Sequence, residues 1–524
     1  MKKFFRNLTS GYSLVLFLLL IEVLFVLFVQ LFSDEIAGWL HIENEIWYVF
    51  LYLGIRLAVF IVALIIFFRI VNKPEDPEFK IPWIVGMLLL PFFCSVLFLI
   101  FGNHGLRKKD KVLITASRNA YNAHFKLTEK QKNRYDKELG NAVGAFNYIE
   151  NITQLGVHAN NRVTYYSKGE TFFPELLCSL KQAKEFIFME FFIIADGKWW
   201  SLIQEVLIEK AKEGVEVRLI YDDMGCGGTI ASKTPKILGE YGIKCYKFHP
   251  FRPILSGVYN NRDHRKIVVI DHQMGFTGGM NLADEYANDL KRFGYWKDTM
   301  IKIEGSGINN LITTFLQNYD LASGFVSDYN KYLMYDYHKF LEPGFAMPFG
   351  DGPGGIDDAL IGEQTYVAML NYAKKSVYIS TPYLVPTYQL MDAMRNAAIR
   401  GVQVHLIVPG IPDKKLVYKV AQSNFRYLLD AGVNIYTYTP GFNHMKTVLV
   451  DDELACVGTI NFDFRSLVHH FECAALLYKN KCMKDIRADF DEMLSQSAKV
   501  PMNFKQKRNA RNLCSLVKLI TPLL

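Results

Sequence analysis

Two copies of one pattern combine imidazole, ammonium, carboxylate and amide groups in this 524-residue chain. The first copy holds His264, Lys266, Asp271, Gly279 and Asn281, and the second holds, at identical spacing, His444, Lys446, Asp451, Thr459 and Asn461. One such pair on a strand is ordinarily a partly exposed polar pair. Its exact repetition within a longer internal repeat favours a composite site that attacks and holds a phosphodiester.

The chemistry of phosphodiester cleavage explains the residue types. The reaction needs a nucleophile, a proton donor for the leaving alkoxide, and cations beside the phosphoryl oxygens. One histidine can attack phosphorus while the other protonates the leaving group and then deprotonates the incoming hydroxyl. The two lysines, with Asn281 and Asn461, would hold the phosphoryl oxygens. We therefore expect no metal and no other cofactor.

The spacing also predicts how the side chains point. Residues two apart on a strand share a face, so each His-x-Lys element presents both groups together. Asp271 and Asp451 belong to the candidate catalytic set. Each lies seven positions after its histidine, and on a continuous strand an odd separation places two side chains on opposite faces. We therefore expect both to support loop geometry or ion pairing. The glycine-rich turns that follow can bring backbone N–H groups and the Asn281 and Asn461 amides close to phosphate.

Further polar residues follow each pattern. Asp298 and Glu472 are candidates for orienting an imidazole, and a solvated strand end is the alternative for both. His469 and His470 lie close to Asn461 in sequence and could line the site, but surface or core packing is the favoured interpretation for them.

Three short apolar blocks recur in the same order before each pattern and predict strands. The paired blocks begin at Glu185 and Ser376, at Gly214 and Gly401, and at Gly242 and Gly432. Helical patterns at 199–213 and 388–400, each followed by glycine, separate the first two blocks of each set. This order predicts an α/β fold of two tandem repeats related by a pseudo-twofold axis, with the site at their seam.

The excess of apolar residues over an ordinary soluble enzyme lies in the N-terminal hundred residues. Segments 12–32, 46–71 and 81–101 are each long enough to cross about 30 Å of hydrocarbon. A signal peptide is the competing interpretation of the first, since basic residues precede it, but no small-residue cleavage site follows. We expect two or three membrane segments and a multi-pass protein.

Charge predicts orientation less simply. The basic cluster 107–111 favours a cytoplasmic catalytic region, and the acidic loop 34–45 suits the outer side. Lys2, Lys3 and Arg6 also favour the inside, and three full spans cannot satisfy all of these signals. Glu22 and Gln30 in the first segment and Pro91 in the third mark candidates for an interfacial or re-entrant stretch.

We expect five parts along the chain: a membrane region 1–104, a connector 105–151, repeats 152–340 and 341–500, and a basic amphipathic segment 501–524. The terminal segment can lie on anionic headgroups or pack as a helix with a solvated face.

Eight cysteines without a CxxC pair fit a reducing compartment. A net charge of +7 does not argue for nucleic acid.

The paired patterns, ending in Gly-Gly-Met-Asn281 and Gly-Thr-Ile-Asn461, resemble those of the phospholipase D superfamily, whose repeats are α/β/α sandwiches. Further features that narrow the resemblance are the apolar N-terminal segments, the run Asn461-Phe-Asp-Phe-Arg465-Ser466-Leu, the run Ser380-Thr-Pro-Tyr-Leu-Val-Pro386, and Thr521-Pro-Leu-Leu. Together they resemble the bacterial cardiolipin synthases over essentially the whole chain. The extra N-terminal apolar segment departs from the two that this family usually shows.

The resemblance implies a metal-independent phosphatidyl transfer in which two phosphatidylglycerols give cardiolipin and glycerol. It implies that His264 is the nucleophile, that His444 is the acid and base, and that Asp298 and Glu472 orient the imidazoles. The expected partners are phosphatidylglycerol and other anionic membrane lipids, and a homo-oligomer is possible.

Other functions remain as alternatives. The resemblance implies a phosphatidyl-histidine intermediate, which a phospholipase D-type hydrolase would pass to water and a related transferase would pass to another alcohol. A nuclease would need a long basic groove with aromatic residues. The membrane segments argue against a nuclease function. A catalytically inactive membrane scaffold would need neither histidine nor lysine pair.

Overall fold

The computed structural model describes residues 45–73, 76–102, 105–125, 128–250, 260–334, 340, 342–353 and 359–521, with Leu24, Leu27 and Leu31 as single helical positions. These residues divide into two compact units. The N-terminal unit holds the described residues up to Gly102 together with those from Lys507 onward, and the large unit holds the described residues from Gly105 to Gln506.

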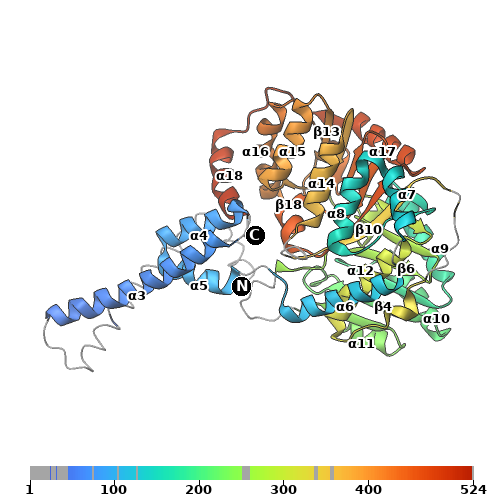
Figure 1. The fold of residues 1–524 in the computed structure, drawn as a ribbon, viewed down its shortest axis with the longest axis horizontal. Coiled ribbons are helices and arrows are strands. Elements are labelled where there is room, and N and C mark those ends of the chain that lie inside the picture. The colour runs from blue at the N-terminus through green and yellow to red at the C-terminus, as the bar shows by residue number, and fades with distance from the viewer. Residues whose placement is uncertain are drawn as a thin grey trace. The chain divides into compact units, whose positions relative to one another are not determined.

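Two sheets form the centre of the large unit (Figure 1). The first has the order β2 (Arg162–Tyr166), β9 (Met300–Glu304), β7 (Met274–Gly278), β6 (Lys266–Ile270), β3 (Phe186–Phe191), β4 (Glu216–Asp222) and β5 (Lys244–Phe248). The second has the order β1 (His158–Ala159), β10 (Phe345–Asp351), β19 (Glu472–Tyr478), β17 (Leu454–Gly458), β16 (Thr447–Val450), β11 (Ser376–Ser380), β13 (Gln403–Pro409), β14 (Asn434–Tyr438) and β20 (Ser497–Lys499).

The seven neighbouring strands of the second sheet that run in space from β10 through β19, β17, β16, β11 and β13 to β14 have the same order and directions as the seven strands of the first sheet. In each sheet the strand that follows the His-x-Lys element, β6 or β16, is antiparallel to both of its neighbours. The next strands, β3–β4–β5 and β11–β13–β14, are parallel. The predicted α/β repeat is therefore present twice, and the sheet in each copy is mixed rather than wholly parallel.

The helices repeat as well. The helices of the first repeat are α9 (Gly169–Lys181), α10 (Lys198–Lys212), α11 (Thr234–Gly239) and α12 (Ile308–Ser323), and their counterparts are α14 (Ile361–Tyr372), α15 (Tyr388–Ile399), α16 (Lys415–Leu429) and α17 (Met483–Ser495). Figure 1 shows α14, α15 and α16 side by side over the second repeat. The predicted helices 199–213 and 388–400 are confirmed as α10 and α15 within one residue at each end.

Two apolar clusters make the core of the large unit. One lies between the first sheet and helices α9 and α10. The other includes residues of both sheets together with α12 and α17, and every residue of α12 from Ile308 to Asp320 is buried. Because both sheets share this second cluster, the two repeats form one packed body.

The segment expected as a connector is helical and packed. It forms α6 (Lys108–His124), α7 (Glu129–Leu139), a short 3₁₀ turn (Gly140–Ala142) and α8 (Val143–Thr153). Helix α6 contacts α12 of the first repeat, and α8 contacts α14 of the second. The strand β1 that follows pairs with β10, so the chain enters the second sheet before it builds the first.

The N-terminal unit contains α3 (Glu45–Asn72), α4 (Pro77–Leu89), α5 (Pro91–Phe101) and α18 (Arg508–Ile520). Within the described part of the chain, one helix, Val49–Asn72, is long and apolar enough to cross a membrane. The first predicted membrane segment, 12–32, lies outside the described residues except for Leu24, Leu27 and Leu31.

The third predicted membrane segment, 81–101, is not a single helix, and it breaks just before Pro91, the residue that marked it as a candidate re-entrant stretch. Leu90 leaves the helical region, with φ −138° and ψ 70°, immediately before Pro91. The rings of Trp83 and Phe98 then lie 5.3 Å apart, edge to face. Fifteen residues of continuous helix would separate them by about 22 Å. Helices α4 and α5 therefore fold back on each other as a hairpin.

Candidate active site

Short strand pairings between the repeats bring the two His-x-Lys elements to one place. Strand β15 (Gly441–Asn443), just before His444, pairs in parallel with β8 (Tyr295–Lys297) of the first repeat. The symmetric contact is a bridge between Asp263 and Phe471. The backbone next to each histidine is therefore paired with a strand segment of the other repeat.

Backbone hydrogen bonds fix this register. The N–H of His264 donates to the carbonyl of Phe471 over 2.9 Å, and the N–H of His444 donates to the carbonyl of Lys297 over 2.7 Å. The residue after each acceptor is a carboxylate, Glu472 or Asp298. Each imidazole consequently meets a carboxylate from the opposite repeat.

The first half-site joins His264 to Glu472. Nδ1 of His264 lies 3.0 and 2.9 Å from the two Glu472 carboxylate oxygens, and both side chains are buried. A carboxylate accepts hydrogen bonds, so it holds the proton on Nδ1 and leaves the lone pair on Nε2. His264 is thereby fixed in the tautomer that a nucleophile requires.

The second half-site joins His444 to Asp298. Nδ1 of His444 lies 2.6 Å from Asp298 Oδ2. Lys446 Nζ lies 2.7 Å from the same Nδ1 and 3.9 Å from the carboxylate. Burial raises the pKa of Asp298 to about 6, with the Lys446 charge acting in the opposite direction. At neutral pH Asp298 remains mostly ionised and can hold the imidazole proton.

Two buried lysines accompany the histidines. Lys266 Nζ donates to the His264 carbonyl over 2.7 Å, and Lys446 Nζ donates to the His444 carbonyl. Burial lowers the pKa of Lys266 to about 7 and that of Lys446 to about 8. A bound anion would offset this desolvation and favour the charged ammonium groups.

The imidazoles are electrostatically coupled to both lysines. Burial, followed by the charges of Lys266 and Lys446, lowers the pKa of His264 well below its usual range. Burial and the same two lysines act likewise on the pKa of His444. Because cations of both repeats act on each histidine, the two copies of the pattern form one site. Its two lysine ammonium groups can hold the oxygens of a phosphate anion.

Gly279 and Thr459 occupy equivalent positions and accommodate carboxylates of different length. A Cβ at position 279 would lie 2.0 Å from Asp298 Oδ1, so only glycine leaves room for that carboxylate. Thr459 instead donates its hydroxyl to Glu472 and accepts the backbone N–H of Cys473 over 2.9 Å. Each residue thus fits the carboxylate of its own repeat.

The two asparagines expected near phosphate have different surroundings. Asn281 Oδ1 accepts the backbone N–H of Ile193 over 3.0 Å, and its Nδ2 donates to the Tyr286 hydroxyl over 2.6 Å. Asn461 is also buried, but its Oδ1 has no hydrogen-bond partner among the described residues. The Asn281 amide is engaged in loop structure, whereas Asn461 keeps hydrogen-bonding capacity.

Asp271 and Asp451 lie at the far ends of strands β6 and β16. Each has φ 51° and accepts three backbone N–H groups. The donors are Lys184, Glu185 and Phe186 for Asp271, and Lys374, Lys375 and Ser376 for Asp451, at 2.8–2.9 Å. Both carboxylates anchor the starts of β3 and β11, and neither contacts an imidazole.

Sequence reasoning did not place the rings that surround the two histidines. Trp296 lies 5.7 Å from His444 between ring centroids, and His470 lies 5.4 Å from His264. Trp296 and His470 each stand two residues before the orienting carboxylate of their repeat. Aligning the two repeats on Asp298 and Glu472 reveals that Trp296 and His470 are equivalent. This alignment is the sequence signal that could have placed His470 in the site.

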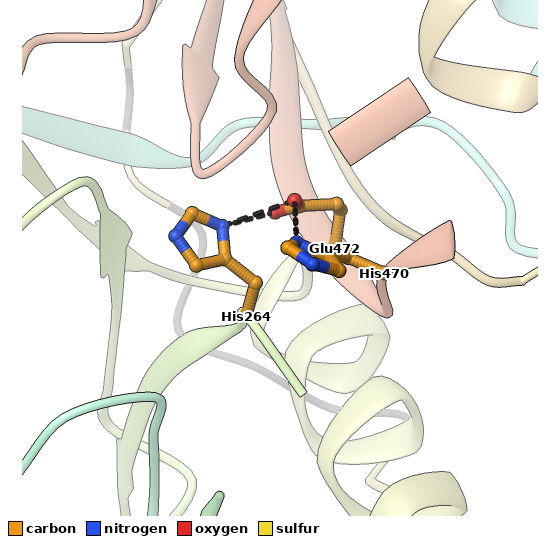
Figure 2. A group of neighbouring side chains, drawn as sticks. All are labelled: His264, His470 and Glu472. Atoms are coloured by element: carbon orange, nitrogen blue, oxygen red, sulfur yellow. Dashed lines mark hydrogen bonds and ion pairs between the residues drawn. The ribbon is translucent and has the colours of Figure 1, made fainter. Parts of the chain in front are cut away.

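His264, His470 and Glu472 form a group of potential metal ligands (Figure 2). One donor atom from each lies within 4.8 Å of the other two, and all three residues are buried. His470 Nδ1 lies 3.5 Å from Glu472 Oε1. Spacing along the sequence does not reveal this group because the fold brings His264 to Glu472 from 208 positions away.

Comparison with known proteins follows the same two repeats. Residues 176–314 and 366–494 match the family described as "Cardiolipin synthase, PLD-like domain". Cardiolipin synthase 2 of Bacillus anthracis is 32% identical over 475 residues, which cover 89% of this chain and 90% of that protein. An uncharacterized protein of Streptococcus mutans is 41% identical over 460 residues, covering 87% and 98%.

A solved structure shares the fold. The phosphatidylserine synthase of Haemophilus influenzae superposes with a TM-score of 0.58 at 15% identity, covering 72% of this chain and all of that one. At this identity the similarity establishes architecture alone.

Proposed function

The chain belongs to the cardiolipin synthase family of the phospholipase D superfamily, and we propose that its phosphatidyl transfer is carried out by His264 and His444. The enzyme is a phosphatidyltransferase that joins two phosphatidylglycerols into cardiolipin and releases glycerol. The observation that supports the residue assignment is the crossed pairing of each imidazole with a carboxylate of the other repeat. This pairing leaves one Nε2 available from each half-site.

In the first step, Nε2 of His264 attacks the phosphorus of one phosphatidylglycerol. The N–P bond forms as the bond from phosphorus to the headgroup glycerol oxygen breaks, and His444 donates a proton from Nε2 to that oxygen. Lys266 and Lys446 stabilise the charge on the non-bridging oxygens. The products are glycerol and a phosphatidyl-histidine.

In the second step, His444 takes the proton from a headgroup hydroxyl of another phosphatidylglycerol. That oxygen attacks phosphorus, the N–P bond breaks, and cardiolipin forms with His264 restored. Glu472 and Asp298 keep the proton on each Nδ1 throughout, so that both Nε2 atoms remain available.

Substrate binding also supplies the charge that His444 needs to act as an acid. In the free site burial, followed by the charges of Lys446 and Lys266, lowers the pKa of His444 well below its usual range. A phosphodiester anion between the lysines offsets their charge and raises the pKa of His444. Substrate binding therefore favours the protonated form that an acid requires.

Incubation of the detergent-solubilised protein with phosphatidylglycerol alone tests the reaction. Mass spectrometry is expected to show cardiolipin and glycerol in equal amounts. Phosphatidic acid without cardiolipin would instead identify a hydrolase, and the variants His264→Ala and His444→Ala serve as inactive controls.

The N-terminal unit supports a multi-pass arrangement in the membrane. Helix α3 has 28 residues, or about 42 Å, against the roughly 30 Å of a bilayer core. Helices α4 and α5 have 13 and 11 residues, about 20 and 16 Å, so neither crosses alone. The hairpin therefore enters and leaves on one side.

A re-entrant hairpin reconciles the charge signals of the sequence. Segment 12–32 and helix α3 would provide two crossings, which return the chain to the side where it started. Basic residues at 2–6 and at 107–111 are then both cytoplasmic, and the acidic loop 34–45 is outside. The catalytic region follows in the cytoplasm.

Cysteine labelling tests this topology. Ser33→Cys is expected to react with a membrane-impermeant maleimide in intact cells, and Ser10→Cys only after permeabilisation. Labelling of Ser10→Cys in intact cells would overturn the arrangement.

A further inference from the structure

The two half-sites differ at one position that has a chemical consequence. Trp296 of the first repeat packs near His444, and its equivalent, His470, packs near His264. An indole ring offers no metal ligand, whereas an imidazole does. Only the His264 half-site therefore combines two imidazoles with a carboxylate.

The surroundings of His470 do not satisfy its ring. Its side chain is 10% exposed, and neither ring nitrogen has a hydrogen-bond partner among the described residues. Glu472 Oε1 lies 3.5 Å from Nδ1, beyond good hydrogen-bond distance. A buried polar group without such a partner in a native fold calls for an explanation such as an ion.

We propose that His264, Glu472 and His470 bind a transition-metal dication such as Zn²⁺, and that the bound metal inhibits phosphatidyl transfer. Two imidazoles and one carboxylate are a donor set that Zn²⁺ accepts, with a fourth position left for water. The donor atoms already lie within 4.8 Å of one another, and Figure 2 shows both rings directed toward the carboxylate. Bound Zn²⁺ would draw the three donor atoms to distances of about 2.1 Å from the metal.

Inhibition follows from the tautomer of His264. Nδ1 now carries the proton that Glu472 accepts, and Nε2 carries the lone pair. Metal coordination through Nδ1 uses the lone pair of that nitrogen, so the proton moves from Nδ1 to Nε2. No proton is released, but Nε2 loses the lone pair that attacks phosphorus. The metal also withdraws Glu472 from its orienting contact.

The consequence for turnover rests on the proposed role of His264, whereas metal binding does not. The two parts can therefore be measured separately. Co²⁺ reports binding through its visible absorption, and Zn²⁺ reports inhibition through transfer activity.

The binding experiment is a Co²⁺ titration of the full-length protein in neutral detergent without lipid. One equivalent is expected to give the d–d absorption of a four- or five-coordinate site, without thiolate charge-transfer bands. His470→Trp, which copies the other half-site, and His470→Asn are expected to weaken binding about tenfold or more. His405→Asn is the matched control, because His405 packs on Tyr378 and Tyr436 outside this group.

The activity experiment adds Zn²⁺ at fixed phosphatidylglycerol and then removes it with EDTA. The unaltered protein and His405→Asn are expected to lose activity reversibly, and His470→Trp is expected to need about tenfold more Zn²⁺. Equal Co²⁺ affinity in the His470 variants and the unaltered protein, or no Co²⁺ absorption at all, would overturn the site. Co²⁺ binding without any transfer activity would leave the metal site standing and refute the proposed function.

Discussion

The half-site around His264 and the half-site around His444 share one backbone plan and differ in their side chains. Both imidazoles receive a backbone hydrogen bond and a carboxylate from the opposite repeat. The first uses a glutamate supported by a threonine hydroxyl, and the second uses an aspartate for which a glycine makes room. The two repeats thus share the contact between imidazole Nδ1 and a carboxylate, and they differ in the residues that hold that carboxylate.

This difference suggests separate tasks for two equivalent histidines. Glu472 contacts His264 with both oxygens and is held by Thr459, so that ring is tightly oriented. Burial and the charge of Lys446, which lies beside His444, lower the pKa of that imidazole, so the doubly protonated form is disfavoured until an anion binds. Tight orientation suits a nucleophile, and a charge that responds to substrate suits an acid and base.

The largest expected effect is loss of either imidazole. His264→Ala and His444→Ala should each lower kcat by at least about 10⁴-fold. A phosphatidyl ester with a p-nitrophenol leaving group needs no acid, so it should restore the first step to His444→Ala and not to His264→Ala. Mass spectrometry of the trapped phosphatidyl-protein measures this. An adduct that forms in His264→Ala would exchange the two roles.

The next largest effect concerns the carboxylates. Asp298→Asn and Glu472→Gln should each lower kcat by about 10³-fold, because an amide can donate to Nδ1 and favour the wrong tautomer. Substrate binding should change little. Steady-state kinetics on both variants, with melting temperatures as the folding control, measure the effect. Full activity in either variant would show that its half-site does not need the carboxylate.

Positions 279 and 459 test how each repeat accommodates its carboxylate. Gly279→Ala should cost about 10²-fold in kcat, since the added Cβ displaces Asp298. Thr459→Gly removes one hydrogen bond to Glu472 and should cost only about tenfold. The comparison is made on the same lipid substrate. Similar losses in the two variants would contradict the proposed difference.

The pH dependence reports the lysines. The pKa values of about 7 for Lys266 and about 8 for Lys446 describe the free enzyme. The two lysine side chains bind phosphate strongly only in their protonated, ammonium form. We therefore expect kcat/KM to fall as the pH rises through about 7 to 8. Arginine retains its charge, and Lys446→Arg should move the upper part of this decline to higher pH, as a rate profile from pH 6 to 10 would reveal.

The smallest effect on chemistry is expected at the strand starts. Asp271→Asn and Asp451→Asn each weaken three backbone contacts and should lower the free energy of unfolding by about 1–3 kcal/mol. Because neither carboxylate contacts an imidazole, kcat should remain within about threefold. Denaturant unfolding and kinetics on the same preparations measure both quantities. A much larger loss of kcat at unchanged stability would assign these residues to the chemistry.

The local elements of this protein were predictable from sequence. Apolar blocks that recur in one order gave β3, β4 and β5 and their counterparts, because strand and helix periodicity is a property of neighbouring residues. The His-x-Lys spacing likewise indicated the site. The break at Leu90 was signalled by Pro91, but composition alone could not distinguish a span from a hairpin.

Tertiary structure decided which groups meet. Glu472 reaches His264, and Asp298 reaches His444, only because strands of the two repeats pair across the seam. The same pairing brought the ring of His470 to 5.4 Å from that of His264. Sequence determined the inventory of reactive groups and the repeat that carries them. Their partners depend on contacts between residues far apart in the chain, which packing of the folded repeats alone specifies.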